Sequence, residues 1–126
     1  MNSRAKGARG ERELAQLLRN QGHIDARRGQ QYCGINGNAD VVGVDGLHIE
    51  CKRVQQIRDE VWLKQAERDA RLGDVPVVIY RRDHEEWKVI LRQDIADRIW
   101  QTLTQEQKND IRAWLKFPKS WTKSDK

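Results

Sequence analysis

The sequence predicts a mixed α/β domain, in which short strands and helices alternate along the 126 residues. Residues 58–72 carry apolar side chains at helical spacing, and 75–81 is a continuous apolar run of the kind found in buried strands. Two further apolar runs, 39–44 and 47–53, are joined by an Asp-Gly dipeptide, which is typical of a hairpin. A helix between a hairpin and a later strand is typical of a crossover connection. These observations favour one sheet flanked by helices.

Turn and capping signals place the elements along the chain. The first helix is stopped by Gly22, and the helix after the hairpin ends at Gly73. Glycines in 29–37 indicate a mobile loop, and Thr104 with Gln107 forms a capping box before the last helix. The expected elements are helix 8–20, weak strand 24–28, strands 39–44 and 47–53, helix 58–72, strands 75–81 and 86–91, and helices 93–101 and 105–115.

Composition limits the class of protein. With 37% hydrophobic and 34% charged residues, the chain has one modest core under a heavily charged surface. No apolar run approaches the roughly 20 residues of a membrane span, so we expect no contact with a membrane. Two cysteines, Cys33 and Cys51, are too few for a disulfide scaffold or a structural zinc site. We expect a cytoplasmic protein, in a cell or a phage-infected host, with no organic cofactor.

The net charge of +5 is unevenly distributed. Residues 1–30 hold seven Lys or Arg against three acids, and residues 116–126 hold four Lys against one acid. The middle, 31–115, holds 13 basic and 15 acidic residues. Basic ends around a mildly acidic centre suit a chain whose ends contact phosphate, although the ends alternatively only aid solubility. We expect one domain over 1–126, with a flexible basic arm at 1–7 and a basic tail from 116.

A carboxylate on the first predicted helix breaks the local pattern. Glu11 shares the apolar face formed by Leu14 and Leu18. A carboxylate aimed at a core is costly unless it meets a cation or a metal. The alternative is a first-turn glutamate that favours the helix N-terminus.

The hairpin carries two more acidic residues and a lysine. Glu50 and Lys52 project from one face of the second strand, which in isolation is also typical of a cross-strand ion pair. A two-residue turn pairs 41 with 50 and puts Asp40 on the wrong face. A three-residue loop ending at Gly46, or a bulge at Gly43, pairs 40 with 50. In that register two carboxylates and a lysine converge, as they do around Mg²⁺.

This pattern resembles the PD-(D/E)xK nuclease superfamily, with Asp40 followed by Glu50-Cys51-Lys52 on the next strand. The opening Lys6-Gly7-Ala8-Arg9-Gly10-Glu11-Arg12-Glu13-Leu14 is similar to the start of archaeal-type Holliday-junction resolvases and their virus-encoded relatives. The similarity covers residues 5–92, but Asn38-Ala39 precede Asp40 where the superfamily's name has a proline. The resemblance implies a restriction-endonuclease-like α/β core, a central mixed sheet flanked by helices, with further C-terminal helices.

The resemblance also implies roles for individual residues. Glu11, Asp40 and Glu50, with the backbone carbonyl of Cys51, would hold Mg²⁺, or Mn²⁺ in its place. Lys52 would orient or activate the attacking water. DNA contacts would come from the basic residues Arg4, Lys6, Arg9, Arg12, Arg27 and Arg28.

Two further residues are candidates for supporting the site. Gln65 faces it if helix 58–72 packs through the stripe that includes Val61, and is turned to the side if the helix packs through the stripe that includes Trp62. His48 shares the face of Glu50, and the alternative is a partly exposed strand histidine.

We therefore expect a Mg²⁺-dependent DNA endonuclease that resolves Holliday junctions as a homodimer, each subunit nicking one strand of a four-way junction. One alternative is a nuclease of the same fold that acts on other branched, nicked or linear DNA. Another is a DNA-binding dimer that does not cleave, but binding alone requires no acidic cluster beside phosphate. A protein-interaction module would leave the basic ends unexplained.

Overall fold

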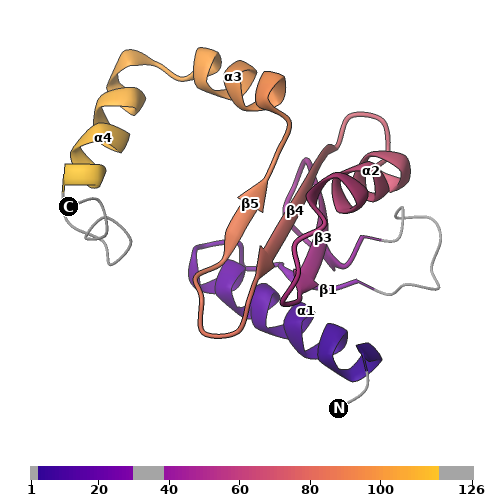
Figure 1. The fold of residues 1–126 in the computed structure, drawn as a ribbon. Coiled ribbons are helices and arrows are strands. Elements are labelled where there is room, and N and C mark those ends of the chain that lie inside the picture. The colour runs from indigo at the N-terminus through magenta and orange to yellow at the C-terminus, as the bar shows by residue number, and fades with distance from the viewer. Residues whose placement is uncertain (1–2, 30–38, 117–126) are drawn as a thin grey trace. The chain divides into compact units, whose positions relative to one another are not determined.

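A computed structural model describes residues 3–29 and 39–116, which fall into two compact units (Figure 1). The first unit spans residues 1–91 and the second spans 92–126, and each is described by itself. Most of the expected glycine-rich loop and of the basic tail lie outside the described residues.

The first unit is a five-stranded mixed sheet with a helix on each face. Its elements are α1 (Ser3–Asn20), β1 (Arg27–Arg28), β2 (Val41–Val42), β3 (Leu47–Arg53), α2 (Asp59–Asp69), β4 (Val75–Arg81) and β5 (Lys88–Ile90). The strands lie in the order β1-β2-β3-β4-β5, with β3 and β4 parallel and the other neighbours antiparallel. Helix α2 is the crossover between the parallel strands. The predicted restriction-endonuclease-like α/β fold is confirmed.

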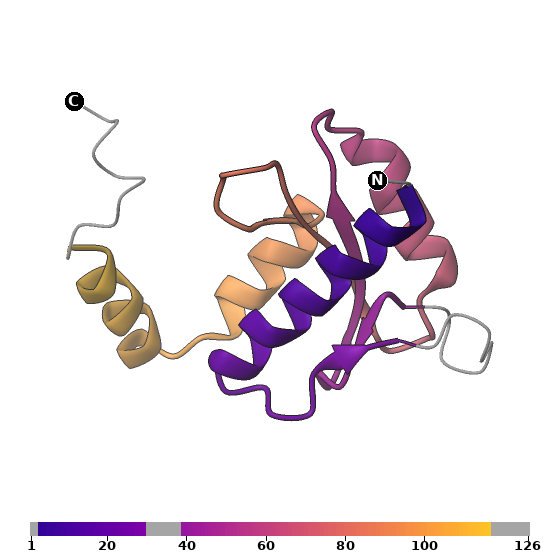
Figure 2. The same cartoon turned by 90° about the horizontal axis from the view of Figure 1, so that it is seen from below.

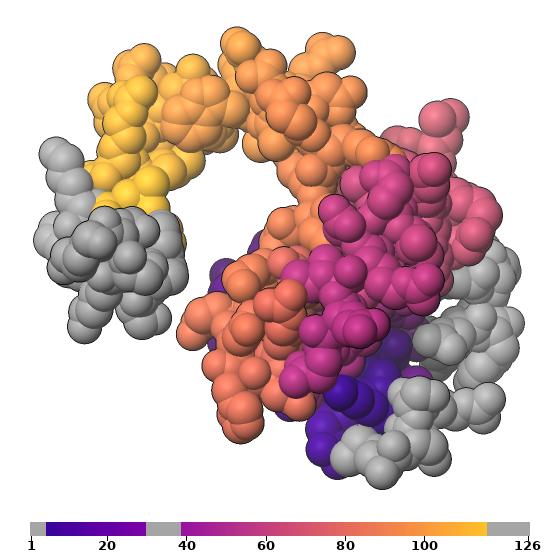
Figure 3. All heavy atoms as spheres, in the orientation of Figure 1, coloured from indigo at the N-terminus to yellow at the C-terminus, as the bar shows by residue number. Residues whose placement is uncertain are grey.

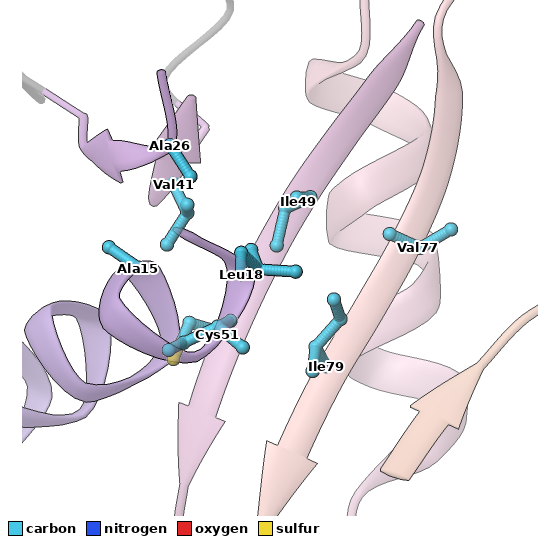
Figure 4. Close-up of a cluster of buried hydrophobic side chains, with 9 residues drawn as sticks. Ala15, Leu18, Ala26, Val41, Ile49, Cys51, Val77 and Ile79 are labelled. Carbon is cyan, nitrogen blue, oxygen red and sulfur yellow. The ribbon is translucent and has the colours of Figure 1, made fainter. Parts of the chain in front are cut away.

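The two helices cover opposite faces of the sheet (Figure 2). On one face, Leu14 and Leu18 of α1 pack against the sheet residues Ile49, Cys51 and Ile79 (Figure 4). On the other face, the buried residues of α2 pack with a residue of β4, and this cluster comprises Trp62, Leu63, Ala66 and Val78. Because side chains alternate along a strand, the odd-numbered residues of β3 face α1 and the even-numbered ones face α2.

The β2–β3 hairpin has the register that brings Asp40 beside Glu50. Val41 pairs with Ile49, and the N–H of Asp40 also donates to the carbonyl of Ile49 at 2.9 Å, so Asp40 lies at the end of β2 next to residues 50 and 51 of β3. Of the two registers that the sequence allows, the structure therefore has the one in which an acidic site can form.

A bulge at Gly43 produces this register. The turn itself is tight, because the N–H of Leu47 donates to the carbonyl of Val44 at 3.2 Å, and without an extra residue it would pair 41 with 50. Gly43 is the extra residue, and its φ of +94° is one that glycine adopts readily. A Cβ on Gly43 would also overlap the carbonyl oxygen of Asp25. Both features require glycine here.

The expected flexible arm at 1–7 is wrong over its described part, because α1 already begins at Ser3. Residues 3–7 lack the apolar stripe that predicts a helix from sequence. Once a helix is nucleated, however, each added residue gains a backbone hydrogen bond at little cost. Strands β1, β2 and β5 are shorter than the predicted 24–28, 39–44 and 86–91, because regular pairing with the neighbouring strand covers only part of each apolar run.

The second unit contains two helices, α3 (Gln93–Thr102) and α4 (Gln105–Lys116). The capping box predicted before α4 is confirmed: the N–H of Gln107 donates to Oγ1 of Thr104 at 3.1 Å, and the N–H of Thr104 donates to Oε1 of Gln107 at 2.7 Å. Helix α3 has no buried residue. Among the described helices, none is long and apolar enough to cross a bilayer.

Candidate active site

A pocket opens where β2 stops and β3 continues. Because β2 has two residues and β3 has seven, no strand of the described residues lies beside the last part of β3 on that side. A cavity of about 790 Å³ lies there, and its wall includes Glu11, Asp40, Cys51, Lys52 and Gln65. Four of these five residues are ones that the sequence assigned to the site or its metal ligands, and Gln65 was a supporting candidate.

Asp40 is bound to the open edge of β3. Its Oδ2 accepts a hydrogen bond from the backbone N–H of Cys51 at 2.8 Å, where a longer β2 would have offered a carbonyl. The residue is 8% exposed. Burial, followed by the nearby carboxylate of Glu50, raises the pKa of Asp40 to about 7, and Glu11 adds to the effect. In the metal-free chain, Asp40 therefore holds its proton to a higher pH than an ordinary aspartate does.

Glu50 is the most deeply buried of the acidic residues, at 1% exposure. Its Oε2 lies 2.8 Å from Nε2 of His48, which is 2% exposed. The alternative of a partly exposed strand histidine is therefore wrong, because the even-numbered face of β3 is covered by α2. Glu50 lies behind the pocket wall, where His48 sets the direction of its carboxylate.

Lys52 extends from β3 toward α2. Its Nζ donates to Oε1 of Gln65 at 3.2 Å. The packing face of α2 is the stripe of Trp62 and Ala66, while Val61 is exposed. Our expectation that this stripe would turn Gln65 away from the site is wrong, because Gln65 lies at the edge of the stripe and the long Lys52 side chain reaches it.

Glu11 is buried beside the pocket, as its place on the apolar face of α1 predicted, and is 6% exposed. Its Oε1 accepts a hydrogen bond from Nε of Arg28 at 2.6 Å. A buried carboxylate next to a half-exposed guanidinium is a favourable charged hydrogen bond. Arg28, a candidate for DNA contact, therefore also holds Glu11 in position.

The other basic candidates lie in different places. Lys6 is on the pocket wall, and Arg9 and Arg12 are exposed on α1. Arg27 donates to the carbonyl of Asp25 at 3.0 Å and lies outside the pocket wall. The side chain of Arg4 is outside the described part of the chain.

The donor set fits a hard divalent cation, although no three His, Cys, Asp or Glu side chains form a ready cluster among the described residues. Carboxylate and carbonyl oxygens are the ligands that Mg²⁺ and Mn²⁺ prefer. Burial raises the pKa of the Cys51 thiol far above its usual range, so the sulfur stays protonated. The Cys51 carbonyl points to the same side of β3 as its N–H, toward Asp40. A cation here would favour the ionised form of Asp40, which burial and the Glu50 carboxylate disfavour.

Sequence reasoning did not single out Arg53, the residue after Lys52. Its guanidinium donates to Glu13 at 2.8 Å and to Asp83 at 2.6 Å, which ties β3 to α1 and to the β4–β5 connection. The signal was present in the sequence, because an arginine on the odd-numbered face of a buried strand requires acidic partners.

The fold and the site together define the class of protein. A mixed sheet between α1 and α2, with Asp40 opposite a Glu-x-Lys strand, is typical of PD-(D/E)xK nucleases. Residues 2–125 match the model of the family described as "Phage putative PDDEXK endonuclease", and the chain belongs to that family. Membership confirms the superfamily prediction, and PD-(D/E)xK nucleases generally use divalent metals. No curated protein and no solved structure matches the chain.

Proposed function

We propose that the chain is a Mg²⁺-dependent endonuclease that cuts branched DNA, with the four-way junction as substrate and a homodimer as the working form. The observation that supports hydrolysis is the hairpin register, which puts Asp40 near Glu50 and Lys52 at a pocket open to solvent. Binding alone would not need buried carboxylates next to phosphate, since they repel it.

Lys52 is suited to act on the reacting groups. An ammonium has three N–H donors, and the contact with Gln65 uses one of them. The other two can orient the attacking water and donate to a phosphate oxygen. Its positive charge stabilises the negative charge that develops on the phosphate in the transition state.

The acidic residues are oriented by neighbours. Arg28 holds Glu11, His48 holds Glu50, and the Cys51 N–H holds Asp40. A divalent cation bound by Asp40, Glu50 and the Cys51 carbonyl, with Glu11 beside it, would polarise the phosphate and supply a water of lowered pKa.

The choice of DNA rests on two features. The opening at 6–14 is similar to that of junction resolvases, and both ends of the chain are basic. Two subunits on one junction would each cut one strand, which gives paired nicks.

The direct test is cleavage of a synthetic four-way junction, a flap, a nicked duplex and a linear duplex of shared sequence, each with Mg²⁺ and with EDTA. We expect paired, Mg²⁺-dependent nicks in the junction. Asp40→Asn and Lys52→Ala should cut at least about a hundredfold more slowly, because each removes a group that acts in the transition state. The matched control is Lys64→Ala, an exposed lysine on α2 outside the pocket wall, which should cut normally.

Each other outcome has a defined meaning. Normal cleavage by Lys52→Ala would contradict the mechanism. Equal cleavage of all four DNAs would support the nuclease activity and contradict the preference for junctions. Junction binding by the wild-type chain with no cleavage under any metal would favour the non-cleaving dimer.

A further inference from the structure

A second cavity, of about 540 Å³, lies next to the pocket lined by Glu11 and Asp40, which we call the acidic pocket, and is lined mainly by basic side chains. Its lining residues are Lys6, Arg9, Arg53, Arg81, Asp83 and His84. They come from α1, the ends of β3 and β4, and the β4–β5 connection, whose indigo, magenta and orange atoms adjoin on the face in Figure 3. Lys6 and Arg53 also line the acidic pocket, so the two cavities share a wall. We call this second cavity the basic cavity.

Two arginines form a fixed wall of the basic cavity. Arg53 donates to Glu13 at 2.8 Å and to Asp83 at 2.6 Å. Nη2 of Arg81 lies 3.6 Å from Oε1 of Glu13, and the Arg81 guanidinium carbon is 5.5 Å from the centre of the Trp87 ring. Because partners hold both guanidinium groups, their positive charge stays in place without a ligand.

The cavity keeps an excess of positive charge. Its four Lys and Arg side chains face two carboxylates, Glu13 and Asp83, which leaves a net charge of +2. The hydrogen bond from Arg53 lowers the pKa of Asp83, so that carboxylate is ionised and is included in the balance. An anion with one or two negative charges would neutralise what remains.

Three side chains of the lining are available to a ligand. Those of Lys6, Arg9 and His84 make no hydrogen bond or ion pair with any residue in the described part of the chain. Arg9 and His84 are exposed and Lys6 is half-buried. His84 has φ of +66°, a conformation that a residue other than glycine adopts only at a cost. An ammonium, a guanidinium and an imidazole are the donors that commonly bind phosphate oxygens.

We propose that the basic cavity binds a backbone phosphate of the cut DNA strand, adjacent to the phosphate that enters the acidic pocket. Successive phosphates of a strand are one nucleotide apart, and the two cavities share Lys6 and Arg53. A strand whose phosphate reaches Lys52 therefore carries a neighbouring phosphate across this shared wall. The identity of the strand rests on the proposed function, whereas anion binding by the cavity does not.

The first experiment uses inorganic phosphate as the probe and requires no cleavage. Phosphate is titrated into the full chain while the imidazole signals of His84 and the Nε–H signals of the arginines are followed by NMR. We expect saturable shifts at His84 and Arg9, and loss of the His84 shifts in Arg9→Ala. Chloride at equal ionic strength is the control. Shifts that are absent, or that chloride reproduces, would overturn the proposal.

The second experiment measures DNA affinity against salt concentration in EDTA, where the DNA stays intact. Arg9→Ala and His84→Asn are the test variants, and Arg71→Ala is their control. Both test changes are at exposed residues, and asparagine is chosen at position 84 because it adopts positive φ readily. Arg71 is an exposed arginine near the start of β4, at the end of the parallel β3–β4 pair away from Arg53. We expect Arg9→Ala to weaken binding on the order of tenfold and to lower the slope of log K against log salt by about 0.9. Arg71→Ala should change neither.

Two further comparisons separate the sources of phosphate and the two proposals. Arg9→Ala should bind DNA with 5′-hydroxyl ends and DNA with 5′-phosphate ends more weakly than the wild-type chain does, and by the same factor. A loss confined to 5′-phosphate ends would overturn the assignment to an internal phosphate. If the wild-type chain binds phosphate and DNA through this cavity but never cleaves, the proposed nuclease function fails while the cavity assignment stands. Equal affinity and slope for Arg9→Ala and the wild-type chain would overturn the cavity assignment, whether or not the chain cleaves.

Discussion

At the scale of single residues, the buried His48–Glu50 pair is the most informative contact of the site. Both side chains are almost fully excluded from water, and their polar atoms lie 2.8 Å apart. A buried carboxylate that loses its partner is left unsatisfied. We regard His48 as a positioning residue, which acts on the reaction through Glu50.

His48→Ala should therefore lower both stability and kcat. We expect a loss of about 1–3 kcal/mol in the free energy of unfolding, because Glu50 loses its hydrogen-bond partner. The KM for DNA should change little, since the pair lies behind the pocket wall. Thermal unfolding and steady-state cleavage measure the two effects.

The matched variant is His48→Gln, whose amide N–H₂ can still donate to Glu50. Recovery of part of kcat in this variant would indicate positioning. Equal kcat values for the alanine and glutamine variants, with different melting temperatures, would mean that His48 only stabilises the fold.

Asp40 should make the metal-free protein less stable as pH rises. Its pKa is about 7 in the folded chain and about 4 when unfolded, so between these values the folded state keeps a proton that the unfolded state has lost. The unfolded state binds fewer protons, and the free energy of unfolding falls with rising pH, by at most about 1.4 kcal/mol per unit. Melting temperatures in EDTA from pH 4 to 8 measure this.

Asp40→Asn is the control for this pH dependence. The amide oxygen can still accept from the Cys51 N–H, but it has no charge, so the slope in that window should flatten. In the wild-type chain, Mn²⁺ affinity should fall about tenfold per pH unit below pH 7, because the metal must displace the proton. A pH-independent affinity by calorimetry would contradict the assignment of Asp40 as a ligand.

At the scale of elements, the sequence predicted more of the fold than of the site's internal contacts. Apolar periodicity and turn residues predicted each described helix and strand in order, because these signals are local. The predicted ends of β2 and β5 were wrong, since apolar runs do not show where regular backbone pairing stops. The environment of His48, Gln65 and Arg28 depends on which face of each element packs, which local patterns do not specify.

The bulge at Gly43 links an element to the chemistry. Val41 pairs with Ile49, and Asp40 lies near Glu50, only because one extra residue is accommodated between β2 and the turn. A one-residue slip in a strand moves every side chain to the other face. The positive φ of Gly43 thus helps decide whether the acidic site exists.

Gly43→Ala should therefore reduce both stability and cleavage. A Cβ would overlap the Asp25 carbonyl oxygen in addition to the strain of positive φ, so we expect a loss of more than about 2 kcal/mol in the free energy of unfolding. Gly46→Ala is the matched control, because Gly46 has φ of +83° with nothing near its Cβ. It should lose about 1 kcal/mol and keep cleaving. Urea unfolding and junction cleavage test the pair, and equal losses would mean that strain alone matters.

At the scale of the whole molecule, the basic residues of the N-terminal region fall into two groups. Residues 1–30 have an excess of positive charge, for which we predicted DNA contact. Some of these basic side chains bind other residues of the chain: Arg28 pairs with Glu11, and Arg19 donates to the carbonyl of Ala26 at 2.7 Å. Lys6 and Arg9 make no such contacts among the described residues. Composition could not distinguish these two groups, because partners are set by the fold.

The core of the chain lies entirely within the first unit. The buried hydrophobic residues of the described chain fall between Leu14 and Ile79, and both clusters contain only residues of 1–91. Helix α3 buries none of its residues. Residues 92–126 hold eight Lys or Arg against five acids, so they carry +3 of the net charge of +5.

A chain ended at Leu91 should therefore fold but bind DNA more weakly. We expect cooperative thermal unfolding with the far-ultraviolet signal of α1, α2 and the sheet, because burial of apolar surface is the main stabilising term and this unit retains it. The slope of log K against log salt should fall by about 0.9 for each phosphate contact that the removed residues make. Circular dichroism and anisotropy in EDTA measure the two effects. Loss of cooperative unfolding would show that α3 or α4 supports the core, and unchanged affinity and slope would show that the charge of 92–126 does not contact DNA.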